Sequence, residues 1–182
     1  MVWEFDVLYF FQGLHNPVGD VIWPLISLLG DKGLFCALTS LLILIFVKDK
    51  RVGLTMIGAW ILDVLICNVC IKPLVMRDRP CWIDPTVQLL VETPDDYSFP
   101  SGHSGIMFSW AVSIFMYHKR FGIAAIVLGV LVMLSRLYLF VHFPTDVLVG
   151  ALCGTIAAII SYFIVKRFWP DIEKRLSARK QA

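Results

Sequence analysis

The chain has 182 residues, of which 58% are hydrophobic and 16% are charged, and its formal net charge is +2. Its mean hydropathy of +0.77 excludes an ordinary water-soluble domain, and no nucleic-acid partner is expected. The apolar residues form runs, and a helix of about 20 residues is enough to cross a bilayer. No alternating pattern typical of a membrane barrel is present. Composition therefore predicts an all-α integral membrane bundle, folded as one domain over residues 1–182.

The first residues predict a helix that lies at the membrane surface. Residues 2–14 are rich in aromatic side chains, but they are too short and too interrupted by Glu4 and Asp6 to span the bilayer. Because acids precede any basic segment, a cleavable signal peptide is not expected. Residues 17–29 form a short apolar run that contains Pro24. A thin first span and a re-entrant hairpin both remain open for this run.

Five further apolar runs predict the other transmembrane helices, about six in all. These runs are residues 34–47, 53–71, 102–117, 121–134 and 144–165. Asp63 lies deep in the second of them, either as a functional group or as a partner of a neighbouring helix. Small residues recur at every fourth position on two of the last three runs. This spacing predicts that those helices pack closely together.

Lysine and arginine gather on one set of connections between the runs. They are Lys48, Lys50, Arg51, Lys119, Arg120, Lys166, Arg167, Lys174, Arg175, Arg179 and Lys180. The positive-inside tendency places these residues, including a basic tail over 166–182, in the cytoplasm. The long loop over 77–100 then lies on the extracytoplasmic side of the cell membrane. Because few cations are expected on that side, those found there need another reason to exist.

The residues with the clearest chemical meaning begin where the long loop meets the next apolar run, at Pro100-Ser101-Gly102-His103. Ser101 is placed to cap the helix, and Gly102 lets another group approach the backbone. His103 lies in the first turn among amides that have no partner within the helix. Such a helix start attracts anions, and a neutral imidazole there can attack phosphorus. Taken alone, however, Ser101-Gly102-His103 is more readily explained as a helix cap.

Other polar residues at the same face supply what phosphoryl transfer would need. Lys72, Arg79 and Arg136 can neutralise phosphate oxygens, the two arginines through bidentate contacts. His142 can protonate a leaving oxygen and later activate water. Asp146 follows it by four residues and can fix its tautomer. No carboxylate cluster is placed to hold magnesium, so neither a metal nor another cofactor is expected.

The spacing of these residues resembles the three signature motifs of the type 2 phosphatidic acid phosphatase (PAP2) superfamily, which shares its site with vanadium haloperoxidases. The matching residues are Lys72 and Arg79-Pro80, then Pro100-Ser101-Gly102-His103, then Ser135-Arg136, His142 and Asp146. The resemblance implies a metal-independent lipid phosphatase in a membrane helical bundle. In that interpretation His103 becomes a phosphohistidine, His142 is the acid and base, and Asp146 supports it. Lys72, Arg79, Ser101, Gly102 and Arg136 would hold the phosphate.

The substrate is less determined than the chemistry. A site outside the cytoplasm favours undecaprenyl pyrophosphate, with phosphatidylglycerol phosphate or phosphatidic acid as alternatives. Transfer of phosphate to another lipid remains open, as does a transporter or binder that holds anionic headgroups without cleaving them. Arg77 lies inside the first motif. We interpret it as a solvated loop cation, with contact to a second phosphate as the alternative.

Overall fold

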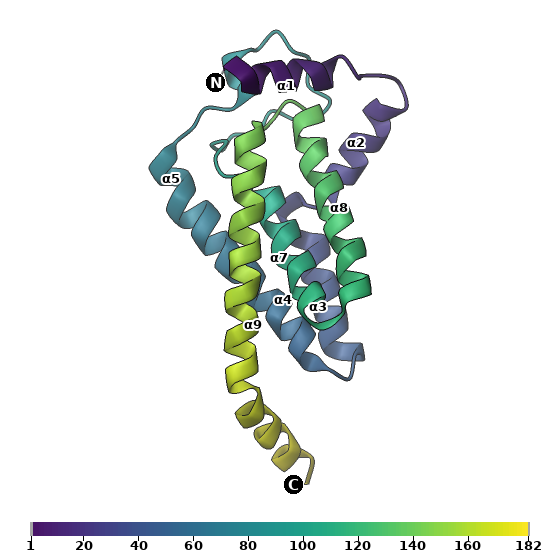
Figure 1. Cartoon of the computed structure of the whole chain (residues 1–182), viewed down its shortest axis with the longest axis vertical. Helices are drawn as coiled ribbons and strands as arrows, with labels where there is room; N and C mark the ends of the chain where they lie inside the picture. Colours follow the sequence, from purple (N-terminus) through teal and green to yellow (C-terminus); the bar gives the residue numbers. More distant parts are fainter. Residues whose placement is uncertain (1, 182) are drawn as a thin grey trace.

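The computed structural model describes the backbone of residues 2–181 and the side chains of residues 2–174. Every regular element in this part of the chain is helical, which confirms the all-α prediction. The helices form an elongated bundle with α1 across one end (Figure 1). Of the predicted basic tail, the side chains of Arg175, Arg179 and Lys180 lie outside the described residues.

Helix α1 (Val2–Gln12) agrees with the surface helix predicted over residues 2–14. It runs roughly perpendicular to the long helices, over the turn that joins α8 to α9 (Figure 1). Its inner face buries Leu8 completely, in a cluster that includes Phe140 and Phe143 of that turn. Its outer face exposes large apolar side chains such as Phe10. An apolar outer face on a helix of this orientation is typical of a segment that lies in the membrane interface.

Three elements account for residues 19–46: α2 (Gly19–Leu28), the short 3₁₀ helix η1 (Asp31–Gly33) and α3 (Leu34–Phe46). Together they are long and apolar enough to cross the membrane once. Both interpretations of residues 17–29 are therefore wrong, because that run is the first half of one broken span. The break is made by Lys32 and Gly33, whose φ angles of 47° and 69° are left-handed.

The next span is built from α4 (Lys50–Asp63), the π-helix η2 (Val64–Ile71) and α5 (Lys72–Val75). It begins earlier than predicted because the Asp49 side chain caps it, accepting a bond from the Arg51 amide at 3.1 Å. Buried Asp63 accepts a bond from Cys67 Sγ at 3.3 Å, one turn along the same segment. Its partner therefore does not come from a neighbouring helix.

A single turn, α6 (Pro80–Ile83), interrupts the long loop, which is followed by α7 (Gly102–Tyr117), α8 (Lys119–Tyr138) and α9 (Pro144–Gln181). Helix α7 packs on α3, α4, α8 and α9 at the centre of the bundle. A Cβ atom added at Gly154 would lie 2.0 Å from the carbonyl oxygen of Gly105. The backbones of α7 and α9 therefore touch, as the small residues predict. Helix α9 also continues beyond the predicted end at residue 165.

Four helical segments in the described part of the chain are long and apolar enough to span a membrane, so the protein is a multi-pass membrane protein. They are Gly19–Phe46, Lys50–Ile83, Lys119–Tyr138 and Pro144–Lys174. The predicted count of about six spans is not confirmed. The α3–α4 and α7–α8 connections lie at one end of the bundle, and the α8–α9 turn and α1 lie at the other (Figure 1). The basic connections and the candidate site are thus at opposite ends.

Candidate active site

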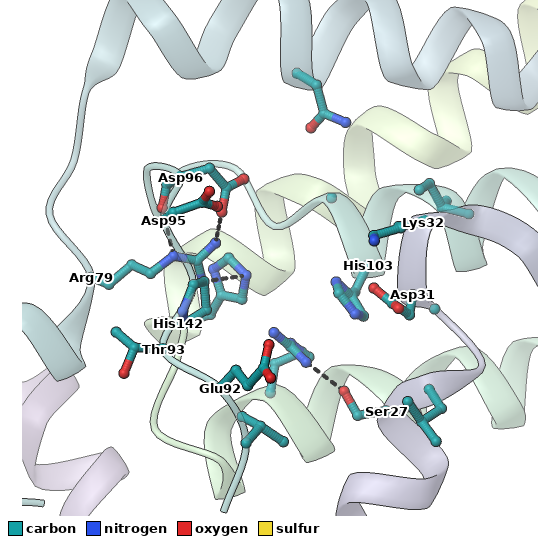
Figure 2. A pocket seen from close by; sticks show the side chains of 18 of the residues that line it. Ser27, Asp31, Lys32, Arg79, Glu92, Thr93, Asp95, Asp96, His103 and His142 are labelled. Carbon is teal, nitrogen blue, oxygen red and sulfur yellow. Dashed lines mark hydrogen bonds and ion pairs between the residues drawn. The ribbon is translucent and has the colours of Figure 1, made fainter. Parts of the chain in front are cut away.

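A cavity of about 730 Å³ opens near the end of the bundle that α1 covers. Six of the eight residues predicted for the site line it: Lys72, Arg79, Gly102, His103, Arg136 and His142. The other two, Ser101 and Asp146, are fully buried behind it. Figure 2 shows His103 and His142 pointing into the same space from opposite sides. Residues separated by up to 70 positions in the sequence thus meet around one space.

His103 occupies the first turn of α7, as predicted. Its ring packs against Gly30, where an added Cβ atom would lie 2.8 Å from the ring carbon Cδ2. The expected side-chain cap is not formed by Ser101, because its Oγ accepts a bond from Ser104 Oγ at 3.2 Å instead. The Ser101 amide donates to the carbonyl oxygen of Asp146 at 3.0 Å. This backbone bond fixes the start of α7 against the start of α9.

Two of the three cations are held by a carboxylate that the sequence did not indicate. Asp96, in the long loop, accepts hydrogen bonds from Lys72 Nζ and, at 2.5 Å, from Arg79 Nη2. Burial raises the pKa of Asp96, but the Lys72 bond and the charges of Arg79 and Lys72 outweigh it and lower this pKa to about 2. Asp96 therefore stays ionised as the anionic partner of both cations.

Arg136 is the third cation and is only 6% exposed. Its Nη1 donates to the hydroxyl of Ser27, and its Nε has no hydrogen-bond partner among the described residues. A buried guanidinium without a full set of acceptors favours a bound anion strongly, because transfer from water has removed its hydration. Arg136 thus has unused capacity to bind the oxygens of a phosphate.

His142 lies in the turn before α9, with Arg79 Nη1 3.2 Å from its Nε2. Burial, followed by the charges of Arg79 and other cations, lowers the pKa of His142 well below its usual value. Its Nδ1 is 3.6 Å from Asp146 Oδ2, which is too long for the direct bond that the sequence predicts. The hydroxyl of Ser98, 3.4 Å from Nδ1, donates to the same Asp146 oxygen at 2.5 Å. Asp146 therefore supports the imidazole partly through Ser98.

Arg77 is neither a solvated loop cation nor a cavity residue, so both interpretations of it are wrong. Its Nη1 donates to Asp146 Oδ1 and its Nη2 to Glu4 Oε2, each at 2.6 Å. The guanidinium carbon lies 4.0 Å from the centre of the Phe143 ring. Arg77 is absent from the cavity lining because its charge is directed to the far side of Asp146.

The fold and the cavity together define a helical membrane protein whose bundle holds, near one end, a cavity lined by two histidines and several cations. The chain belongs to the PAP2 superfamily, whose model matches residues 52–170. This match confirms the family that the motifs indicate. It also covers the whole of the catalytic half predicted from the sequence.

Two relatives of this chain are named as undecaprenyl-diphosphatases. An undecaprenyl-diphosphatase of Sulfolobus acidocaldarius is 33% identical over 75% of this chain and 66% of its own length. A putative undecaprenyl-diphosphatase of Escherichia coli is 34% identical over 58% of this chain and 52% of its own length. The matches thus span from about half to just under two thirds of these relatives. Both relatives carry the name of a phosphatase, a class of hydrolase.

Two solved structures share the fold. One is LpxE of Aquifex aeolicus, with a TM-score of 0.73 and 29% identity, over 86% of this chain and 93% of that chain. The other is a transmembrane PAP2-type phosphatidylglycerolphosphate phosphatase from Bacillus subtilis. Its TM-score is also 0.73, at 28% identity over 94% of this chain and 86% of that chain. The second is a transmembrane PAP2-type protein, which agrees with the membrane bundle described above.

Proposed function

We propose that the protein hydrolyses a phosphate from a lipid through a phosphohistidine on His103, without a metal ion. One observation carries the proposal: His103 and His142 face each other across a single cavity lined by Lys72, Arg79 and Arg136. A binder of anionic headgroups would need the cations, but it would not need two opposed imidazoles.

In the first step, a nitrogen of His103 attacks phosphorus while the bond from phosphorus to the leaving oxygen breaks. His142 donates its proton to that oxygen. The three cations hold the non-bridging oxygens, and the negative charge of the bound phosphate offsets the cations that lower the pKa of His142. Substrate binding thus favours the protonated imidazole that this step requires.

In the second step, water attacks the phosphorus of the phosphohistidine. His142, now neutral, takes a proton from that water as the bond between phosphorus and nitrogen breaks. Inorganic phosphate leaves, and His103 and His142 return to their starting states. Asp146 would hold His142 in place during both steps through the Ser98 hydroxyl.

We propose a polyprenyl diphosphate of the undecaprenyl pyrophosphate type as the substrate. Relatives named undecaprenyl-diphosphatase support this choice. So does Lys32, which lines the cavity together with the three buried cations and comes from the side of His103 (Figure 2). A diphosphate carries more negative charge than a monoester and has a second phosphate to bind. The family motifs account for cations on one phosphate only, and Lys32 supplies one more.

The proposed orientation places the cavity outside the cytoplasm. The described basic residues at the opposite end of the bundle support this placement through the positive-inside tendency. A lipid diphosphate in the outer leaflet would then reach the cavity from the membrane. Residues 77–100 would form the extracytoplasmic loop over the site.

The function is tested with full-length protein in detergent, by measuring phosphate release from undecaprenyl pyrophosphate, phosphatidylglycerol phosphate and phosphatidic acid in the presence of EDTA. We expect release with EDTA present, fastest from the diphosphate. Activity that EDTA removes and magnesium restores would contradict the metal-free mechanism. Faster release from either monoester would contradict the proposed substrate, and phosphate found on a second lipid would indicate transfer.

Lys32→Ala is expected to lower kcat/KM for the diphosphate about tenfold, because one charged contact to phosphate is lost. The monoester phosphatidic acid is the internal control, and its kcat/KM should change by less than about threefold since it has no second phosphate to contact. The ratio of the two values is the measured quantity. An equal loss on both substrates would contradict a contact to the second phosphate.

Asp96→Asn is expected to tighten the binding of inorganic phosphate about tenfold, because the substituted side chain no longer competes as an anion for Lys72 and Arg79. The inhibition constant of phosphate measures the change. Asp95→Asn is the matched control, since Asp95 is the adjacent acid in the loop and has no ion pair among the described residues. Unchanged or weaker inhibition in Asp96→Asn would show that the carboxylate does not compete with phosphate.

A further inference from the structure

A polar network outside the cavity connects the surface helix α1 to the carboxylate behind His142. Glu4 of α1 is only 4% exposed although it is acidic. Its Oε2 accepts a bond from Arg77 Nη2 and its Oε1 accepts one from Thr145 Oγ1, both at 2.6 Å. Arg77 Nη1 donates in turn to Asp146 Oδ1, also at 2.6 Å. An unbroken path of short bonds therefore runs from α1 to Asp146.

Arg77 holds a second neighbour of His142 as well. Its backbone carbonyl accepts a bond from the Ser98 amide at 2.8 Å. Ser98 is the residue whose hydroxyl lies between Asp146 and His142. Both polar groups next to the imidazole Nδ1 are thus fixed by one arginine, through its side chain and through its backbone.

The charges make Arg77 difficult to replace. The side chains of Glu4 and Asp146 are 5% and 0% exposed, and Arg77 is their shared counter-charge. A buried carboxylate is costly unless it is paired and hydrogen-bonded. Without the guanidinium, two buried acids would face each other with no cation between them, and Asp146 would lose a fixed position.

The apolar side of α1 places Glu4 for this contact. The ring of Phe5 packs edge-on against Phe143 at a centroid distance of 5.3 Å, and Leu8 is completely buried next to the α8–α9 turn. That turn carries His142. Helix α1 therefore contacts the turn through apolar packing, and Glu4 beside that packing forms its ion pair with Arg77 of the long loop.

We propose that Glu4 and Arg77 are positioning residues for His142 and Asp146, and that docking of α1 through Glu4 is required for full activity. The inference rests on the proposed function, because it concerns the acid and base of that reaction. Neither residue lines the cavity, so neither contacts the substrate. Their effect reaches the reaction only through Asp146 and Ser98.

General acid catalysis provides a test that a purely structural role would not pass. An alkyl leaving group needs a proton as its bond to phosphorus breaks, whereas a nitrophenyl leaving group departs without one. The ratio kcat/KM reports the steps up to formation of the phosphohistidine. Loss of positioning at His142 should therefore lower kcat/KM for an alkyl phosphate far more than for p-nitrophenyl phosphate.

The experiment uses the full-length protein in detergent with both substrates. Arg77→Ala should lower kcat/KM for the alkyl phosphate about 100-fold and for p-nitrophenyl phosphate less than about fivefold. Arg77→Lys should recover part of the loss, since it keeps the charge. The glutamine of Glu4→Gln has almost the same shape as the glutamate it replaces. This variant should lower kcat/KM for the alkyl phosphate about tenfold, and again by more than for p-nitrophenyl phosphate. Asp6→Asn, exposed on the same helix, should change neither substrate.

An equal loss on both substrates, or no loss, in Glu4→Gln or Arg77→Ala would overturn the inference. A loss in Asp6→Asn as large as that in Glu4→Gln would do the same, because it would trace the effect to α1 in general. If Arg77→Ala does not fold, the comparison of the two substrates in Glu4→Gln tests the inference. A wild-type protein that releases phosphate from neither substrate would instead overturn the proposed function itself.

Discussion

Replacing His103 by alanine is expected to abolish phosphate release, with a loss of at least about 10⁴-fold in kcat, because the reaction loses its nucleophile. The three cations of the cavity remain, so the affinity for inorganic phosphate should stay within about threefold of the wild type. Two measurements check this expectation: phosphate release from the lipid, and acid-labile phosphate on the protein after brief exposure to substrate. The wild type should carry this acid-labile phosphate label, and the His103→Ala variant should not.

His118→Ala is the matched control, since His118 is an exposed histidine at the opposite end of the same helix. It should retain wild-type activity and labelling. Label that persists in His103→Ala would place the phosphoenzyme on another residue. Activity within about 100-fold of the wild type in that variant would exclude covalent catalysis by His103.

Replacing His142 by alanine is expected to lower kcat for the lipid substrate about 10³-fold, because one residue serves as the acid of the first step and the base of the second. With p-nitrophenyl phosphate the outcome should be different. The first step then needs no acid, so the phosphohistidine forms, and it accumulates because no base activates water. Rapid quenching followed by intact-mass measurement would detect the phosphorylated protein directly.

The control for this variant is His15→Ala. His15 lies at the same end of the bundle, stacked on Tyr138 at a centroid distance of 4.2 Å, and it does not line the cavity. Its loss should leave both substrates unaffected. Failure of the phosphohistidine to accumulate in His142→Ala, while slow turnover continues, would assign the base of the second step to another group.

The residues around the cavity were predictable because phosphoryl transfer demands particular residue types near helix ends. A histidine at the start of one helix, another before a later helix, and cations near both can be recognised from the sequence alone. Asp96, Ser98 and Glu4 have no such signal. They act through contacts between a loop, a turn and a surface helix, and no spacing along the chain indicates which loop acid meets which cation.

Arg77 and the broken first span are two further features that depend on contacts between distant segments, which the sequence does not indicate. Sequence placed Arg77 in a loop, and loop cations are usually solvated, yet two buried acids from distant segments determine its place. Gly30-Asp31-Lys32-Gly33 marks a break between apolar runs. Two consecutive left-handed residues, however, are compatible both with a turn that reverses the chain and with a kink within one helix. Only packing against the rest of the bundle selects the kink.

The contact between α7 and α9 has a consequence for how members of this family diverge. The backbones of Gly105 and Gly154 touch, and the hydrogen bond from the Ser101 amide to the Asp146 carbonyl joins the same two helices again. Helices α7 and α9 therefore form one rigid unit. The wall that faces His103, made by α2 and η1, is not tied in this way. Natural variation in headgroup and tail preference should therefore concentrate in residues 19–33, while the two glycine positions stay small. An alignment of relatives sorted by the lipid they accept would reveal that division.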